Sequence, residues 1–130
     1  MSTGITFDAG ALIAVERRSG RMQALLDEAA KNKVSISVPA GALGQAWRGG
    51  TRQARLAKLL RSDQVSVVAL DELRARAAGV LCGQTGTSDL IDASVVLCAR
   101  EQDGDGGGTV VTSDADAIKQ LDANLTVYEV

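Results

Sequence analysis

Two aspartates one helical turn apart are the residues best placed to do chemistry. Asp89 and Asp92 lie in residues 88–99, a stretch that is apolar on almost every side and that we predict to be a buried helix. An ionised carboxylate in such a place needs a counter-charge. Two carboxylates on one helix face also repel each other and raise each other's proton affinity. A divalent cation would relieve both effects, so the pair predicts a metal site.

Three more aspartates follow expected strands. Asp8 comes directly after residues 5–7, and Asp114 and Asp116 follow residues 109–112. In a parallel α/β sheet, ligands bind outside the carboxyl ends of the strands, so one cleft could gather all five acids. Helix capping is the alternative for most of them, since an Asp after a strand often caps the next helix. Asp92 lacks that alternative.

The amino-acid composition excludes several kinds of catalytic and metal site. The 130 residues contain no histidine and two cysteines, Cys82 and Cys98, which we interpret as small buried hydrophobes. Histidine-based acid–base catalysis, Ser-His-Asp and Cys-His nucleophiles and His-rich zinc sites are therefore excluded. Oxygen ligands alone select a hard cation, Mg²⁺ or Mn²⁺. Such a cation can activate water and neutralise a phosphodiester without a histidine base.

The elements that must position these acids follow an α/β order. Aromatic residues make up 2% of the chain, so the core must come from Val, Leu, Ile and Ala, which suits a parallel sheet between helices. We predict one domain over residues 1–130 with a mostly parallel five-stranded sheet. The expected strands are residues 5–7, 34–38, 65–69, 109–112 and 126–130. The expected helices are residues 11–17, 22–30, 39–48, 51–61, 71–81, 88–99 and 113–121, with turns at 49–50 and 83–88.

A basic stripe is the other charged feature. Arg48, Arg52, Arg55, Lys58 and Arg61 recur at spacings of three or four, which we assign to one helical region. A solvated face is the usual meaning of such a stripe, and contact with phosphates is the alternative. The net charge of −2 does not itself indicate nucleic-acid binding.

Targeting features are not visible. The N-terminus lacks a basic start followed by a long apolar run, and no segment reaches the length of a membrane span, so a cytoplasmic protein is expected. The glycines of residues 104–108 precede a strand rather than a helix, which favours a surface connector over a phosphate-binding loop.

Four segments together resemble a known family. TFDAGALIA at residues 6–14, VPAGALGQAWRGG at 38–50, SDLIDA at 88–93 and VTSDAD at 111–116 are similar, in this order, to PIN-domain ribonucleases, specifically the VapC-type toxins of bacterial toxin–antitoxin pairs. The resemblance implies a PIN-like α/β/α sandwich and RNA cleavage that depends on Mg²⁺ or Mn²⁺. It also implies a VapB-type antitoxin as partner and a homodimer.

The resemblance also assigns roles to residues. Metal ligation falls to Asp8, Asp89, Asp92, Asp114 and Asp116, catalysis to Asp8, Asp92, Asp114 and Gln45, and substrate contact to Arg48, with Arg52 beside it in the stripe. The alternative for Arg48 is a surface charge at a helix end without a role in binding. Trp47 is expected in the core, with an antitoxin contact as the alternative.

Gln45 departs from the family pattern, which usually has glutamate at this position. An amide oxygen can still accept a hydrogen bond or ligate a hard cation, but it carries no charge. We therefore expect weaker metal binding with retained activity, because four or five aspartates remain. The second hypothesis is a PIN-like module that binds RNA or a protein partner and does not cleave RNA.

Overall fold

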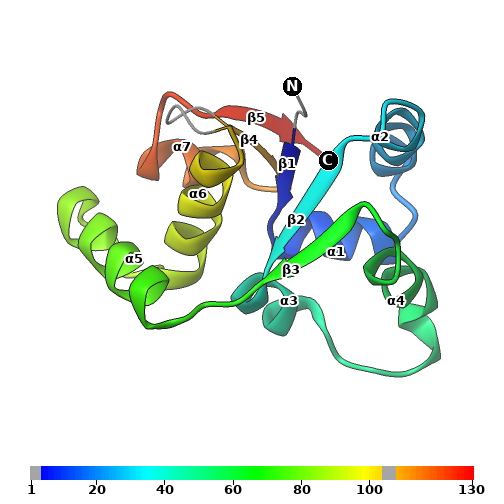
Figure 1. Cartoon of the computed structure of the whole chain (residues 1–130), viewed down its shortest axis with the longest axis horizontal. Coiled ribbons are helices and arrows are strands. Elements are labelled where there is room, and N and C mark those ends of the chain that lie inside the picture. Colours follow the sequence, from blue (N-terminus) through cyan, green and yellow to red (C-terminus); the bar gives the residue numbers. More distant parts are fainter. Residues whose placement is uncertain (1–3, 104–107) are drawn as a thin grey trace.

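A five-stranded sheet forms the centre of the molecule (Figure 1). The computed structural model describes residues 4–103 and 108–130. The strands are β1 (Gly4–Phe7), β2 (Ser35–Pro39), β3 (Val65–Val68), β4 (Thr109–Thr112) and β5 (Thr126–Glu129). Their order in the sheet is β3-β2-β1-β4-β5, and all four pairings are parallel. The predicted parallel sheet is confirmed.

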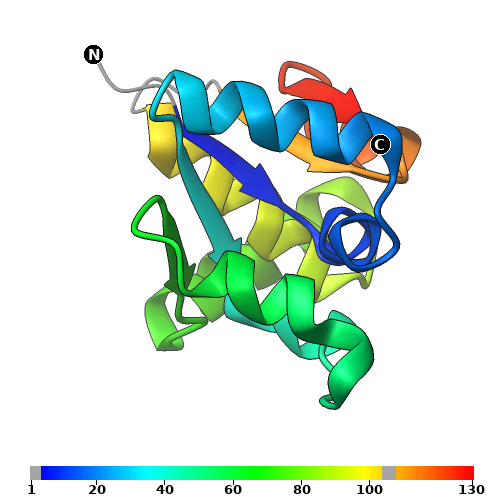
Figure 2. The same ribbon diagram turned by 90° about the vertical axis from the view of Figure 1, so that its right-hand side faces the viewer.

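Helices cover both faces of this sheet. One side carries α1 (Ala9–Glu16), α2 (Gly20–Lys31) and α4 (Ala54–Leu60), and the other carries α5 (Glu72–Thr85), α6 (Leu90–Asp103) and α7 (Ala115–Leu121) (Figures 1 and 2). The short helix α3 (Ala40–Ala46) and the 3₁₀ turn η1 (Thr51–Gln53) connect β2 to α4. The result is the α/β/α sandwich predicted from the sequence.

Each face of the sheet has its own hydrophobic core. Phe7, Leu12, Met22 and Leu56 are fully buried on the α1–α2–α4 side, while Val95, Val96, Val110 and Ile118 fill the α6–α7 side. Aliphatic side chains dominate both clusters, as the low aromatic content requires. Residues 4–103 and 108–130 include no helix with the length and hydropathy needed to span a bilayer.

The strand order reverses between β1 and β4. From β1 the chain adds β2 and then β3 on one side, and afterwards β4 and β5 on the other. The register of Thr6 with Val110 and Phe7 with Val111 aligns the carboxyl ends of the two central strands. A crevice forms outside the carboxyl ends of the strands at such a switch point. Asp8 and Asp114 follow these two strands.

Several predicted boundaries were wrong. The helix expected to end at Leu81 continues as α5 to Thr85, with Gly83 inside it, and stops at Gly86, whose φ of 73° is left-handed. Glycine supplies that conformation without a Cβ penalty, so the helix ends at Gly86, inside the predicted turn of residues 83–88, and not at Leu81. The next helix extends past Ala99 to Asp103. The predicted glycine connector lies largely outside the described residues.

The basic stripe does not lie on one helix. Arg48 precedes Gly49 and Gly50, whose φ values of 78° and 96° break the helical path. Arg52 belongs to η1, and α4 begins only at Ala54. The spacing of three or four residues predicted one continuous helical stripe, but the backbone changes direction between Arg48 and α4.

Candidate metal centre at the switch of strand order

Asp8 is buried between β1 and α1, with 7% of its surface exposed. Its Oδ1 accepts a hydrogen bond of 2.9 Å from the backbone N–H of Ala11, which makes it the N-cap of α1. Its Oδ2 accepts from the hydroxyl of Thr112 on β4. The capping interpretation of Asp8 is therefore correct. It does not exclude a second role, because each carboxylate oxygen has further acceptor capacity.

Thr112 connects two of the predicted acids. Its fully buried hydroxyl donates to Asp8 and accepts a hydrogen bond of 2.9 Å from the backbone N–H of Asp114. Asp114 in turn caps α7, because its Oδ1 accepts from the N–H of Ala117 at 3.2 Å. A single hydroxyl thus fixes the distance between the ends of β1 and β4. No role was predicted for Thr112, although a hydroxyl residue at a strand end two positions before an Asp is a usable signal.

Asp89 and Asp92 occupy the start of α6. Asp89 is exposed, and its Oδ1 accepts a hydrogen bond of 3.0 Å from the N–H of Asp92. Asp92 lies in the first turn of α6, at the start of the predicted helix, but it is partly exposed and not fully buried as its apolar sequence context suggested. The positive end of the helix dipole favours both carboxylates there.

The carboxyl groups of these segments influence one another. The pKa of Asp92 is raised from 3.8 to about 7, first by burial, then by Asp89, and further by Asp8 and Asp114. Burial also raises the pKa of Asp8, with Asp114 adding to the rise, although the hydrogen bonds from Thr112 and Ala11 oppose it. Four acids from three helix starts therefore share one electrostatic environment. Such an environment is unfavourable to further negative charge and favourable to a cation.

The donor chemistry of this acidic centre, defined as Asp8, Asp89, Asp92 and Asp114, fits a hard cation. Every side-chain donor is a carboxylate oxygen, and the set lacks sulfur and imidazole. Within residues 4–103 and 108–130, however, no three acidic or cysteine side chains are already arranged to hold a metal ion. Asp116 is exposed in the first turn of α7. The assignment of metal ligands stays a prediction.

Gln45 lies in the last turn of α3 with an exposed side chain. Helix α3 packs on both α1 and α6, the helices whose first turns carry Asp8 and Asp92. Gly41 of α3 is in close contact with Ile91 of α6, where a Cβ would meet the Ile91 side chain at 2.5 Å. Gln45 therefore lies on a helix that contacts both α1 and α6, and its catalytic role stays a prediction.

Arg48 and Arg52 are both exposed, as substrate contact requires. The Arg48 guanidinium donates to the carbonyl oxygen of Trp47 at 2.8 Å. Trp47 is 40% exposed, so its expected place in the core was wrong: α3 ends at Ala46, and extended backbone at Trp47 carries the ring outward.

Gln53 holds the loop that carries Arg48, a role that the sequence did not reveal. It is 2% exposed, and its Oε1 accepts from the N–H groups of Arg48 and Gly49, both at 2.8 Å. Its Nε2 donates to the carbonyl oxygen of Ala46 at 2.8 Å. One amide thus satisfies three backbone groups of a turn that has no regular structure.

We expect Gln53→Leu to lower the free energy of unfolding by about 2–3 kcal/mol, because three backbone groups lose their partner while the side-chain volume is kept. Urea unfolding followed by circular dichroism measures this change. Gln120→Leu, at an exposed position on α7, is the matched control and should change stability by less than about 0.5 kcal/mol. Equal stability of the two variants would contradict the assigned role of Gln53.

The raised pKa of Asp92 predicts a pH dependence of stability. A carboxyl group whose pKa is higher in the folded state binds its proton more tightly there, so folding is penalised once the pH exceeds the unfolded pKa. Stability of the metal-free chain should therefore fall as the pH rises from 3.8 to about 7. Asp92→Asn should remove about 1–2 kcal/mol of this loss, since partial exposure weakens the effect.

Urea unfolding at pH 5 and pH 8 in the presence of a chelator measures this dependence. Asp63→Asn, in the turn before β3, replaces an exposed aspartate outside the acidic centre and should keep the wild-type pH dependence. A fall in stability that is as large in Asp92→Asn as in the wild type would show that Asp92 is not the group responsible.

The parallel order β3-β2-β1-β4-β5 and the helices on both faces form the PIN-like α/β/α fold expected from the sequence. At the level of sequence, no protein-family model matches the chain, and a comparison with curated proteins also gives no significant match.

Solved structures with this fold are found. A chain of VapBC2 from Rickettsia felis, bound to a DNA fragment from its promoter, matches with a TM-score of 0.70 and 16% identity over 98% of this chain and 99% of that one. FitAcB from Neisseria gonorrhoeae matches with a TM-score of 0.58 and 16% identity, and the match covers 96% of both chains. PAE2754 from Pyrobaculum aerophilum matches with a TM-score of 0.58 and 17% identity, and the match covers 96% of this chain and 83% of that one. These likenesses confirm the predicted resemblance to VapC-type PIN domains at the level of the fold.

Proposed function

We propose that this chain is a metal-dependent endoribonuclease and the toxin of a type II toxin–antitoxin pair. The observation that carries the proposal is the acidic centre: Asp8, Asp92 and Asp114 come from three distant segments and act on one another at the switch point of a PIN-like sheet. A nuclease without histidine needs such a centre, because a divalent cation must then activate the attacking water in place of a histidine base. The resemblance to VapC-type toxins, supported by the fold, suggests RNA as substrate in the cytoplasm.

The residues of the acidic centre would share the work. Asp8, Asp92 and Asp114 would hold Mg²⁺ or Mn²⁺, with Asp89 and Asp116 as additional oxygen donors. When bound, the cation would activate water and neutralise charge on the RNA phosphate. Thr112 keeps Asp8 and the backbone of Asp114 in a fixed relation, and the Asp89 cap fixes the start of α6. The protein's own contribution is therefore to preorganise oxygen donors.

The positive charge of residues 17–61 would attract the RNA backbone. Residues 17–61 contain ten Lys and Arg but only two Asp and Glu. The four ion pairs of the described residues involve Arg74, Arg76 and Arg100, so these ten cations are not used in ion pairs within that part of the chain. Exposed Arg48 and Arg52 are the proposed phosphate contacts.

A groove on the α1–α2–α4 side suits the proposed antitoxin. It has a volume of about 760 Å³, and Met22, Leu26 and Leu59 are among its apolar lining, with Arg18 and Lys58 among its charged residues. An amphipathic helix with an acidic polar face would match this apolar groove with basic side chains. A VapB-type antitoxin with such a segment, and a homodimer of this chain, complete the proposed assembly.

The proposal is tested by incubating purified chain with a mixture of structured RNAs. Cleavage should require Mg²⁺ or Mn²⁺ and stop when EDTA is added. Sequencing of the new RNA ends would identify the cleavage site. RNA that is bound in a gel-shift experiment but remains intact with either cation would favour the second hypothesis, a PIN-like module that binds without cutting. This alternative is supported by Gln45, whose exposed amide adds no negative charge to the acidic centre.

Gln45→Glu is expected to tighten divalent-metal binding about tenfold and to raise the rate of cleavage at limiting metal, because it adds a negative oxygen donor on the helix between α1 and α6. Calorimetric titration with Mn²⁺ and cleavage rates at low Mn²⁺ measure both effects. Gln23→Glu on α2 adds the same charge on another helix and serves as control. An equal gain in both variants would assign the effect to net charge and contradict a role for position 45.

A further inference from the structure

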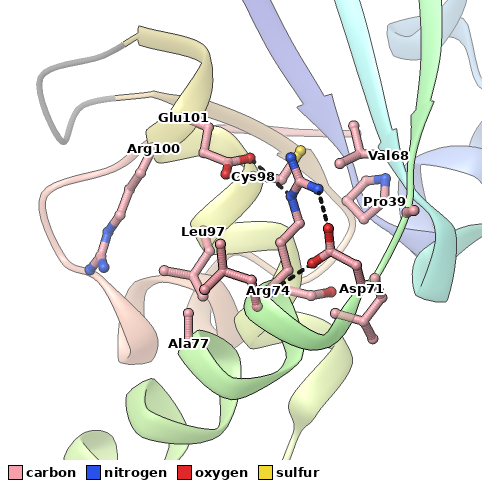
Figure 3. A pocket seen from close by; sticks show the side chains of 13 residues that line it. Pro39, Val68, Asp71, Arg74, Ala77, Leu97, Cys98, Arg100 and Glu101 are labelled. Carbon is pink, nitrogen blue, oxygen red and sulfur yellow. Dashed lines mark hydrogen bonds and ion pairs between the residues drawn. The ribbon is translucent and has the colours of Figure 1, made fainter.

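A cavity on the α5–α6 side of the sheet has no part in the acidic centre. It has a volume of about 600 Å³ and lies between α5, α6 and the carboxyl ends of β2 and β3 (Figure 3). Pro39 and Val68, which are neighbours in the sheet, line it together with Leu97 of α6. The space exists because α6 covers β1 and β2, while α5 packs mainly on α6 and leaves the end of β3 uncovered. Small side chains such as Ala77 and Cys98 keep it open.

The size and lining of this cavity suit a small organic molecule. Pockets of about 300–1,000 Å³ with apolar walls and a few polar groups are the usual binding sites for such ligands. Most side chains of the lining are apolar, and its polar groups include the guanidinium of Arg74 with the carboxylates of Asp71 and Glu101 beside it (Figure 3).

Arg74 determines the charge that the cavity accepts. Its Nη1 donates to Asp71 at 3.1 Å and its Nε to Glu101 at 3.5 Å. Arg100, also part of the lining, is paired with Asp122 at 2.9 Å. The cavity wall therefore offers no surplus positive charge, and an anionic ligand gains nothing from entering it.

Arg74 also determines the polar group that the ligand needs. Within the described part of the chain its Nη2 donates to no protein acceptor, while Nη1 and Nε are used. A carbonyl oxygen placed at this nitrogen would receive a charge-assisted hydrogen bond. A ligand without an acceptor would leave the donor without that bond, and a carboxylate would meet the two flanking carboxylates.

We propose that this cavity binds a neutral, mainly apolar small molecule that bears one carbonyl oxygen, with the carbonyl at Arg74 and the apolar body between Val68, Leu97 and Ala77. The inference does not depend on the proposed nuclease activity. Success or failure of the binding experiment therefore leaves RNA cleavage to be judged separately.

The test uses three probes of similar size. Benzamide is neutral and has a carbonyl, benzoate is anionic, and toluene has no acceptor. Titration of the ¹⁵N-labelled full chain, followed by the amide signals of α5 and α6, should show saturable shifts with benzamide and at least about tenfold weaker binding of the other two. Absence of saturable shifts with benzamide overturns the proposal. Equal binding of benzoate overturns the assigned ligand class.

Two variants locate the binding. Ala77→Leu fills the cavity from an exposed position, and Arg74→Met removes the donor while keeping the length of the stem. Each should weaken benzamide binding about tenfold or more. Ala24→Leu, at an exposed position on α2, is the matched control and should bind like the wild type. Unchanged binding in Ala77→Leu, or equal loss in Ala24→Leu, would place the ligand elsewhere and contradict the proposal.

Discussion

Replacing Asp92 by asparagine should lower the rate of metal-dependent RNA cleavage by about three orders of magnitude, a loss typical of an electrostatic group at a reaction centre. The substitution keeps the shape of the side chain and the cap from Asp89, whose Oδ1 accepts from the backbone N–H of residue 92. It removes the negative charge at the position where the fields of Asp89, Asp8 and Asp114 combine. Initial rates at saturating Mn²⁺ on one RNA substrate measure the effect.

Stability separates this loss from unfolding. Because burial and the neighbouring acids disfavour the ionised form of Asp92, Asp92→Asn should be as stable as the wild type or more stable at pH 8 without metal. Asp8→Asn should also lose activity, but it weakens the cap of α1 and the contact with Thr112. Asp63→Asn is the matched surface control. Cleavage by Asp92→Asn at the wild-type rate would remove Asp92 from the site.

Thr112→Val is expected to have the second largest effect. The change keeps the shape of the side chain but leaves the buried Oδ2 of Asp8 and the N–H of Asp114 without their partner. We expect a loss of about 2–3 kcal/mol in the free energy of unfolding and a clear fall in cleavage rate, because the ends of β1 and β4 are no longer tied together. Urea unfolding and initial rates measure the two effects.

Thr112→Ser is the control that isolates the hydroxyl group. It keeps both hydrogen bonds and removes one buried methyl group, at a cost of about 1 kcal/mol. Its cleavage rate should stay close to that of the wild type. If Thr112→Ser and Thr112→Val lost activity equally, packing and not the hydroxyl would explain the role of Thr112.

The fold could be predicted from the sequence because its signals are local and repeated. Alternating strand and helix patterns gave the parallel sheet, and Asp8 and Asp114 marked the carboxyl ends of the two strands that are adjacent at the switch point. The length of α5 was missed because Gly83 was taken as a turn, although a glycine inside a helix is tolerated when neighbouring side chains pack well.

The internal arrangement of the site could be predicted only in part. Asp92 was singled out for burial in an apolar helix, and burial is indeed the largest cause of its raised pKa, but the contributions of Asp89, Asp8 and Asp114 depend on how the fold brings these acids together. Thr112 and Gln53 were missed because their roles depend on partners that only the fold brings into contact: Asp8 lies 104 positions from Thr112, and Gln53 serves a loop without periodic pattern. Trp47 and Arg48 were misplaced because α3 ends before them.

Calorimetric titration of Mn²⁺ into the wild type and Asp92→Asn at pH 6 tests the central claim, that the acidic centre holds a divalent cation. Because the pKa of Asp92 is about 7, the metal must displace protons at this pH, and the heat should vary with the ionisation enthalpy of the buffer. We predict saturable binding with proton release in the wild type, and weaker binding without that release in Asp92→Asn. Absence of saturable binding in the wild type, or identical titrations of both proteins, would contradict the account.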